Sequence, residues 1–216
     1  GSSEGVHSAL GTRTRRVALL TGCAQTVLAP NINDATVRFL RRHGCEVVIP
    51  TTTGCCGALT HHMGKGGEEF ARPMIDYWTQ AIDEGGLDAI IINTSGCGTT
   101  VKDYGFMFRS DPDYTEKAAK VSALAMDITE FAATLDLEFD SLPDAPKVVY
   151  HPACSLQHGQ KVTREPSALL RSAGFAVSVP KEAHLCCGSA GTYNLLHPQT
   201  ADALRERKLG HIAAEN

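Results

Sequence analysis

Gly54-Cys55-Cys56-Gly57 places two adjacent cysteines between glycines, and the pattern returns later as Cys186-Cys187-Gly188. Each doublet follows another cysteine by 32 positions, because Cys23 precedes the first doublet and Cys154 precedes the second. The pattern C-x31-C-C-G therefore occurs twice. Thiolates are soft metal ligands, and glycines let the backbone approach a bound centre closely. The repeat predicts metal or iron–sulfur sites in which each doublet acts with a distant third cysteine.

The composition limits the kind of protein to which such a site can belong. With 216 residues, 43% of them hydrophobic, the chain is long enough for one large domain or two small ones. A formal charge of -4 without a basic block argues against a nucleic-acid partner.

No stretch approaches the ~20 apolar residues of a membrane span. Residues 1–15 lack the apolar core of a signal peptide, and we expect them to form a flexible leader. We therefore expect a cytoplasmic protein, in which eight cysteines favour metal or redox use over disulfides.

Three apolar runs in the first half each end close to a cysteine. Short runs of this kind are typical of strands buried on both faces of a parallel sheet, and the periodic stretches between them predict helices. In an open parallel α/β sheet, ligands bind beyond the carboxyl ends of the strands. We therefore expect Cys23, the first doublet and Cys97 to converge there. The expected elements are strands at residues 17–20, 47–49 and 88–93, helices at residues 30–43, 70–82 and 113–125, and a further helix opened by a capping box at residues 127–130.

The second half repeats the order of the first. A strand from Lys147 leads to Cys154, a helix is expected at residues 166–173, and a strand follows at residues 175–179. Gly44 and Pro50 recur as Gly174 and Pro180 at an offset of 130, whereas the cysteines recur at 131. The sequence thus predicts an α/β fold of two pseudo-repeated, Rossmann-like modules with short parallel sheets and flanking helices. The expected domains are a leader (residues 1–15), a first module (16–135), a linker (136–146) and a second module (147–216).

The repeat also predicts that the second module is incomplete. Moving Cys97 forward by 131 positions gives position 228, whereas the sequence ends at Asn216. The helix expected from Pro198 to about Ile212 would then be the last element, and the counterparts of the third strand and of Cys97 would be missing. We expect the second sheet to have an open edge.

These motifs resemble the tandem cysteine-rich CCG domains of the heterodisulfide reductase B-subunit family. The resemblance covers residues 16–213 and includes the residues between the cysteines. Within that family, three segments are most similar to the iron–sulfur subunits of glycolate oxidases (glycolate dehydrogenases). They are Gly54–Gly64 (GCCGALTHHMG), Tyr150–Gln160 (YHPACSLQHGQ) and His184–Tyr193 (HLCCGSAGTY).

The resemblance implies an electron-transfer function. It implies a subunit that accepts electrons from FAD-binding flavoprotein partners and passes them towards a membrane quinone. The subunit would be cytoplasmic, attached through its partners to the inner face of the plasma membrane, and inactive alone. The implied ligands of a [4Fe–4S] cluster are Cys23, Cys55, Cys56, Cys97, Cys154, Cys186 and Cys187.

Two differences from the family pattern limit the type of cluster that we expect and the part of such a subunit that the chain represents. Members of the wider family close each module with C-x-x-C, whereas Thr94 stands at the earlier position here and only Cys97 remains. Four thiols in place of five argue against the noncubane cluster of heterodisulfide reductases. The ferredoxin-like run C-x2-C-x2-C-x3-C-P, which related subunits carry, does not occur in this sequence. We therefore expect the cysteine-rich part of such a subunit.

The residues themselves leave a second function open. Four thiolates suit a tetrahedral zinc ion as well as a cluster, so the chain could be a zinc-stabilised structural or interaction module without redox activity. His151, His158 and His184 flank the cysteines of the second half and are predicted to donate hydrogen bonds to a cluster or to carry protons, with ordinary surface positions as the alternative. Cys45 lies outside the repeat and is expected to be a small core residue.

Overall fold

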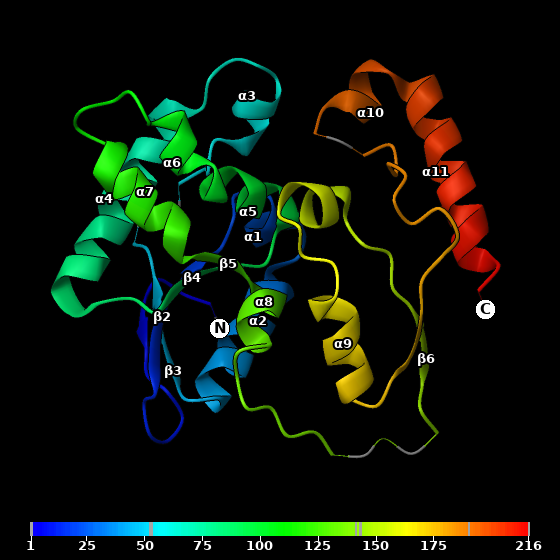
Figure 1. Ribbon diagram of the computed structural model, residues 1–216, viewed down its shortest axis with the longest axis horizontal. Coiled ribbons are helices and arrows are strands. Elements are labelled where there is room, and N and C mark those ends of the chain that lie inside the picture. The colour runs from blue at the N-terminus through cyan, green and yellow to red at the C-terminus, as the bar shows by residue number, and fades with distance from the viewer. Residues whose placement is uncertain (1, 52–53, 141, 143, 190, 216) are drawn as a thin grey trace. The chain divides into compact units, whose positions relative to one another are not determined.

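The computed structural model describes residues 2–51, 54–140, 142, 144–189 and 191–215. The chain divides into two compact units (Figure 1): unit 1 ends at Leu135 and unit 2 begins at Asp136. The linker expected at residues 136–146 falls at the start of unit 2, and residues 141 and 143 within it lie outside the described residues. None of the described helices combines the length and apolar character that crossing a membrane requires.

Unit 1 is built on a mixed five-stranded sheet in the order β1-β3-β2-β4-β5. The four strands β2 to β5 are parallel, and β1 runs antiparallel to β3. The three predicted strands are confirmed as β2, β3 and β4, whereas β1 and β5 were not predicted and the sheet is not purely parallel. The strands are β1 (Gly5–His7), β2 (Arg15–Leu20), β3 (Cys45–Ile49), β4 (Ala89–Ile92) and β5 (Ala125–Asp127).

Part of the segment expected as a flexible leader at residues 1–15 forms regular structure, because β1 pairs with β3. Val6 in β1 pairs with Val48 in β3. Beyond β1, the backbone N–H of Leu10 donates to the carbonyl of Arg41 at 2.8 Å, and the Arg41 side chain donates to the carbonyl of Ser8 at 2.7 Å. Because β1 has only three residues, no alternating pattern could reveal it in the sequence.

Helices cover both faces of the unit 1 sheet, because successive residues of a buried strand point to opposite faces. Ala18 and Leu20 of β2 belong to one core cluster with residues of α4, α5 and α7, whereas Val17 and Leu19 belong to a second with residues of α2 and α8. The helices of unit 1 are α1 (Gln25–Leu28), α2 (Pro30–Arg42), α3 (Ala58–His62), α4 (Glu68–Gly85), α5 (Ser95–Lys102), α6 (Tyr104–Met107), α7 (Thr115–Leu124) and α8 (Ile128–Ala132).

The predicted helices of unit 1 are confirmed with shifted ends. The helix expected at residues 113–125 is α7, and its last expected residue, Ala125, instead begins β5. The capping box at the start of α8 is present: the Asp127 side chain accepts from the backbone N–H of Thr129, and the Glu130 side chain accepts from the backbone N–H of Asp127, both at 2.8 Å.

Unit 2 has a two-stranded parallel sheet in which Lys147 of β6 pairs with Ala176 of β7. Its helix α9 ends before Gly174, which has φ of +90°, as α2 ends before Gly44, which has φ of +76°. The expected strands and helices of this half are confirmed. The elements are β6 (Lys147–Val149), the π-helix η1 (Ser155–Gly159), α9 (Glu165–Ser172), β7 (Ala176–Ser178), α10 (Tyr193–Leu196) and α11 (Pro198–Ala213).

Candidate metal centre

The cysteines of unit 1 lie at the carboxyl ends of three neighbouring strands. Cys23 follows β2, the doublet Cys55-Cys56 lies in the loop between β3 and α3, and Cys97 is the third residue of α5, just after β4. Because β2, β3 and β4 are adjacent and parallel, these loops meet at one edge of the sheet. The topology thus brings together residues that are up to 74 positions apart, from Cys23 to Cys97.

The four thiols of unit 1 form two hydrogen-bonded pairs, Cys97 with Cys56 and Cys55 with Cys23. Cys97 donates a hydrogen bond to Cys56, which lowers the pKa of Cys56 to about 7, and the same bond, with burial, raises the pKa of Cys97. Burial raises the pKa of Cys55, which also shares a hydrogen bond with Cys23. The loops that carry the four cysteines converge at one edge of the sheet, whereas a common site for the four sulfurs and their role as metal ligands stay predictions.

The loop around the first doublet is held by close backbone contacts. Gly57 has φ of +80°, and its N–H donates to the Cys55 sulfur at 3.4 Å. A Cβ atom at Gly57 would lie 2.6 Å from the carbonyl oxygen of Gly67, so no side chain fits there. The hydroxyl of the fully buried Tyr104 donates to the carbonyl of Cys56 at 2.7 Å. These contacts fix the direction in which the two thiols leave the backbone.

The second doublet has the same local shape. Gly188 has φ of +85°, and its N–H donates to the Cys186 sulfur at 3.3 Å. A Cβ atom there would lie 2.4 Å from the carbonyl oxygen of Ala201 in α11. In the described part of unit 2, however, no hydrogen bond joins Cys154 to the sulfurs of Cys186 or Cys187. The ligand role of these three cysteines stays a prediction.

The donor set of unit 1 fits a sulfur-ligated centre by its chemistry. Four thiols, one exposed, two half-buried and one buried, match in number and type the S4 ligation of a [4Fe–4S] cluster or of zinc. Across the described residues, no three His, Cys, Asp or Glu side chains already surround a common point as metal ligands would. Thiols that hydrogen-bond to one another must lose their protons and turn towards a metal before they can ligate it.

The three flanking histidines do not contact a cysteine sulfur within the described residues. His158 Nε2 lies 3.1 Å from the carbonyl oxygen of His184. His151 Nε2 is buried and lacks a hydrogen-bond partner, and burial lowers the pKa of its ring. Their predicted role beside a metal centre is therefore untested and stays a prediction.

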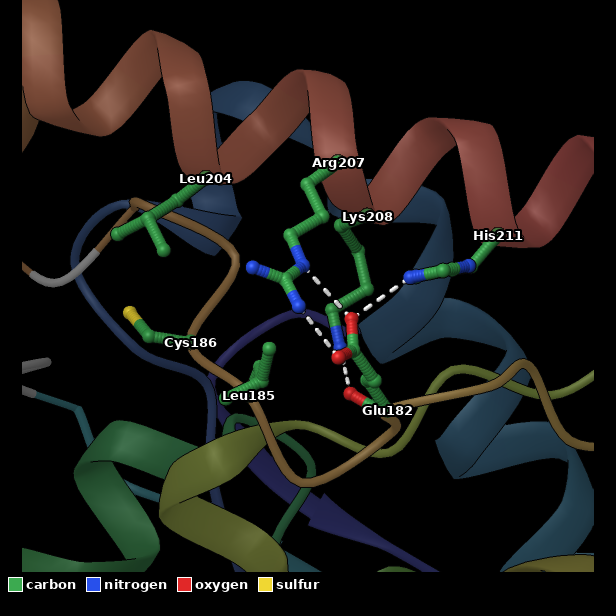
Figure 2. A pocket seen from close by; sticks show the side chains of 7 residues that line it. All are labelled: Glu182, Leu185, Cys186, Leu204, Arg207, Lys208 and His211. Carbon is green, nitrogen blue, oxygen red and sulfur yellow. Dashed lines mark hydrogen bonds and ion pairs between the residues drawn. The ribbon is translucent and has the colours of Figure 1, made fainter.

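Sequence reasoning missed a charged cluster that packs α11 against the loop before the second doublet (Figure 2). Arg207 donates two hydrogen bonds to the Glu182 carboxylate, at 2.7 and 2.5 Å, and His211 Nε2 lies 2.7 Å from the same group. These contacts lower the pKa of Glu182 to about 2. The buried Lys208 donates to the carbonyl of Glu182 at 2.7 Å. Cys186 lines the pocket beside this cluster, so α11 positions the loop that carries the second doublet.

A second feature that no motif indicated lies in unit 1. The side chains of Gln25, Asn33, Asn93 and Thr94 form a hydrogen-bonded network at the carboxyl end of the sheet. Asn33 is only 1% exposed, although the apolar spacing of α2 predicts Ile32 on the buried face, and Ile32 is 42% exposed. The network could have been recognised in the sequence only from the asparagine within the α2 segment, and hydrophobic patterning does not predict that such a residue is buried.

Comparison with known proteins identifies the family. The model of the family described as "CCG: Cysteine-rich domain" matches residues 17–102 and 148–216. The chain is 44% identical over 200 residues to the glycolate oxidase iron–sulfur subunit of Escherichia coli (strain K12), which covers 92% of this chain and 49% of that protein. It is 32% identical over 210 residues to the probable glycolate oxidase iron–sulfur subunit of Bacillus subtilis (strain 168), which covers 95% of this chain and 46% of that protein.

The relatives differ in length. The chain spans about half the length of these two proteins. It spans 82% of lactate utilization protein A of Geobacillus thermodenitrificans (strain NG80-2), to which it is 28% identical over 203 residues, or 91% of this chain. The family match covers both segments that contain a C-x31-C-C-G repeat. The chain therefore belongs to the CCG cysteine-rich domain family.

Proposed function

We propose that Cys23, Cys55, Cys56 and Cys97 bind a [4Fe–4S] cluster. The observation that carries this proposal is that the adjacent parallel strands β2, β3 and β4 bring the four cysteine loops to one edge of the sheet, where Cys97 pairs with Cys56 and Cys55 with Cys23. Backbone N–H groups of Gly57 and Ala58 donate to the sulfurs of Cys55 and Cys56, and such bonds stabilise anionic sulfur. A bound cluster of this kind would take up and release single electrons.

The chain would then serve as the cysteine-rich part of an iron–sulfur subunit. The electron donor in this proposal is an FAD-binding flavoprotein that oxidises glycolate, and the final acceptor is a membrane quinone. The names of the two relatives from Escherichia coli and Bacillus subtilis support glycolate. The relative named for lactate utilization supports the wider class of 2-hydroxy acids. The flavoprotein partner, and not this chain, would select the acid.

We also propose that the two units are copies of one Rossmann-like module. The order β6-η1-α9-β7 in unit 2 follows the order β2-α1-α2-β3 in unit 1, and each copy places a cysteine after its first strand. The matching φ values and N–H to sulfur bonds at Gly57 and Gly188 support this duplication. Cytoplasmic location and attachment to the membrane through partners remain part of the proposal.

Iron analysis of the full chain tests the cluster. After anaerobic reconstitution with iron and sulfide, we expect a brown protein with about four irons per chain. Cys23→Ser should lose most of this iron. Cys45→Ala is the matched control, because Cys45 is a fully buried core cysteine outside the set, and it should keep the iron of the wild type.

The same experiment separates the competing function. A zinc-stabilised interaction module is favoured by the same S4 donor set. A colourless wild-type protein that binds one zinc ion per chain and no iron would support that module and contradict the cluster.

A further inference from the structure

The cysteine loop after β2 is held almost without apolar packing. Helix α1, which begins two residues after Cys23, has no buried residue, and its apolar side chains Val27 and Leu28 are 79% and 82% exposed. The hydrophobic core therefore does not fix this segment. Hydrogen bonds are the remaining means by which unit 1 can place the Cys23 thiol.

Within the loop, the Thr26 hydroxyl donates to the carbonyl of Cys23 at 2.9 Å. The side-chain hydrogen bonds that tie the segment to other elements come from the network of Gln25, Asn33, Asn93 and Thr94, which we call the amide lock. Gln25 Nε2 donates to Asn33 Oδ1 and to Asn93 Oδ1, both at 2.6 Å, and Gln25 Oε1 accepts from the Thr94 hydroxyl at 2.7 Å. Asn93 Nδ2 donates to Asn33 Oδ1 at 3.0 Å. Gln25 thus uses its side-chain oxygen and nitrogen together, which makes it the centre of the lock.

The lock is anchored to regular structure on two sides. Asn33 Nδ2 donates to the carbonyl of Thr21 at the end of β2, at 2.8 Å, and Asn93 Nδ2 donates to the Thr36 hydroxyl in α2 at 3.0 Å. A buried polar network whose members satisfy one another is rigid, and it is costly to leave partly unpaired. The α1 segment is therefore tied to β2, to α2 and to the end of β4.

The ends of the lock are close in sequence to two of the four thiols. Gln25 follows Cys23 by two residues, and Thr94 precedes Cys97 by three. On the basis of the proposed function, we infer that the amide lock positions the Cys23 thiol next to Cys55 and so completes the four-sulfur site. Gln25, Asn33, Asn93 and Thr94 are positioning residues in this inference, and none of them is a ligand.

The second pair of thiols has support of its own. The bond from Cys97 to Cys56 joins a doublet held by Tyr104 to a helix, α5, whose Val101 lies in the same core cluster as Tyr104. Loss of the lock should therefore displace Cys23 and leave the Cys56–Cys97 contact intact. This difference separates a positioning role from a general contribution to folding.

The described residues of unit 2 do not repeat the lock. At the offset of the cysteines, 131, Gln25 corresponds to Leu156, which is buried, and Asn33 corresponds to Arg164. Gln157 in η1 instead donates to the carbonyl of Ala183 at 3.1 Å. The lock is therefore specific to the first set of thiols, and Gln157 offers a matched control.

Thiol cross-linking of the metal-free, reduced full chain tests the inference. Dibromobimane bridges two neighbouring thiols by alkylating both, with loss of two bromides and two protons. Mass mapping distinguishes a link from Cys23 to the first doublet from a link between Cys97 and that doublet. We expect Gln25→Leu and Thr94→Val to reduce the Cys23 link several-fold and to leave the Cys97 link unchanged.

Two controls sharpen the result. Thr94→Ser keeps the hydroxyl and should restore the Cys23 link, and Gln157→Ala should change neither link. An unchanged Cys23 link in both Gln25→Leu and Thr94→Val would overturn the inference. Equal loss of both links would also overturn it, because the lock would then support the fold in general.

Cobalt binding tests whether the amide lock affects metal binding by the thiols. Co²⁺ bound by thiolates gives sulfur-to-metal charge-transfer absorption, and Thr94→Val should weaken Co²⁺ binding several-fold relative to Thr94→Ser. Wild-type affinity in Thr94→Val would contradict the positioning role. A wild-type chain that binds neither iron nor Co²⁺ would contradict the proposed function, whereas the cross-linking result would still decide whether the lock places Cys23.

Discussion

At the scale of single residues, the glycine after each doublet determines the shape of the cysteine loop. Gly57 and Gly188 both have positive φ and both direct their N–H groups at the first sulfur of the doublet, at 3.4 and 3.3 Å. An added side chain would collide with the backbone oxygen of a following segment in either unit. The C-C-G sequence therefore adopts the same local conformation in both units of this chain.

Substitution of Gly57 should be much more harmful than substitution of Gly64. Gly57→Ala combines strain at φ of +80°, which costs about 1 kcal/mol, with a Cβ only 2.6 Å from the carbonyl oxygen of Gly67, and the collision adds to the loss. Gly64→Ala has a similar φ, +70°, in open space, and should cost about 1 kcal/mol. Urea unfolding followed by circular dichroism measures both. Equal losses would show that the contact with Gly67 relaxes freely.

Cys45 should be much less reactive than Cys23. It is fully buried in the core of unit 1, and burial raises its pKa to about 11, so very little thiolate forms at pH 8. Cys23, in contrast, is exposed. Timed alkylation with iodoacetamide and mass mapping should show early labelling of Cys23 and labelling of Cys45 only after addition of urea. Similar native labelling rates at both positions would contradict this prediction.

At the scale of the elements, the sequence predicts what depends on hydrophobic periodicity and on caps. Helices α2 and α4, strands β2 to β4 and the capping box of α8 all follow from such signals. Strand β5 does not, because Ala125 continues a helix-favouring run and only pairing with β4 makes it extended. The burial of Asn33 in α2 is equally invisible, because it depends on contacts with Gln25, in another element, and with Asn93, 60 residues away.

The contact between α11 and the second cysteine loop should weaken in acid. Glu182 has a pKa lowered to about 2 by Arg207 and His211, against about 4.3 in an unfolded chain. Its stabilising contribution is therefore complete above about pH 4.3 and is lost as the pH falls towards 2. Glu182→Gln should flatten the part of the pH–stability curve that lies in this range. Thermal unfolding at several pH values measures the difference.

Glu206 provides the control for the acid effect. It lies on the exposed side of the same helix, so Glu206→Gln should retain the pH dependence of the wild type. If Glu182→Gln and the wild type lost stability in parallel between about pH 4.3 and 2, the ion pairs seen in Figure 2 would not be the source of the acid sensitivity.

At the scale of the whole molecule, the spacing of the cysteines predicts which residues belong to a set, and the topology explains why. Three parallel strands end beside one another, so loops distant in sequence meet without any local signal. The spacing of the cysteines does not predict the contacts that hold the cysteine loops in place. These contacts are the amide lock in unit 1 and the ion pairs of Glu182 in unit 2. Such contacts join single polar residues across the fold and leave no periodic pattern.

We expect unit 1 to bind the iron–sulfur cluster and unit 2 to bind no iron. In unit 1 hydrogen bonds pair Cys97 with Cys56 and Cys55 with Cys23, whereas in the described part of unit 2 Cys154 has no bond to the second doublet. A centre with four sulfur ligands therefore has its full donor set in unit 1. We expect a full-length variant with Cys154, Cys186 and Cys187 all changed to serine to keep the iron content and absorption spectrum of the wild type.

The complementary variant completes this test. Serine at Cys23, Cys55, Cys56 and Cys97 should abolish iron binding, while Cys154, Cys186 and Cys187 remain available. Iron and sulfide assays after anaerobic reconstitution measure both variants, and circular dichroism verifies that each is folded. Loss of about half the iron in each variant would mean that each unit binds its own centre. Loss of all iron from the unit 2 variant would mean that its cysteines complete the site, and either result would contradict a cluster held by unit 1 alone.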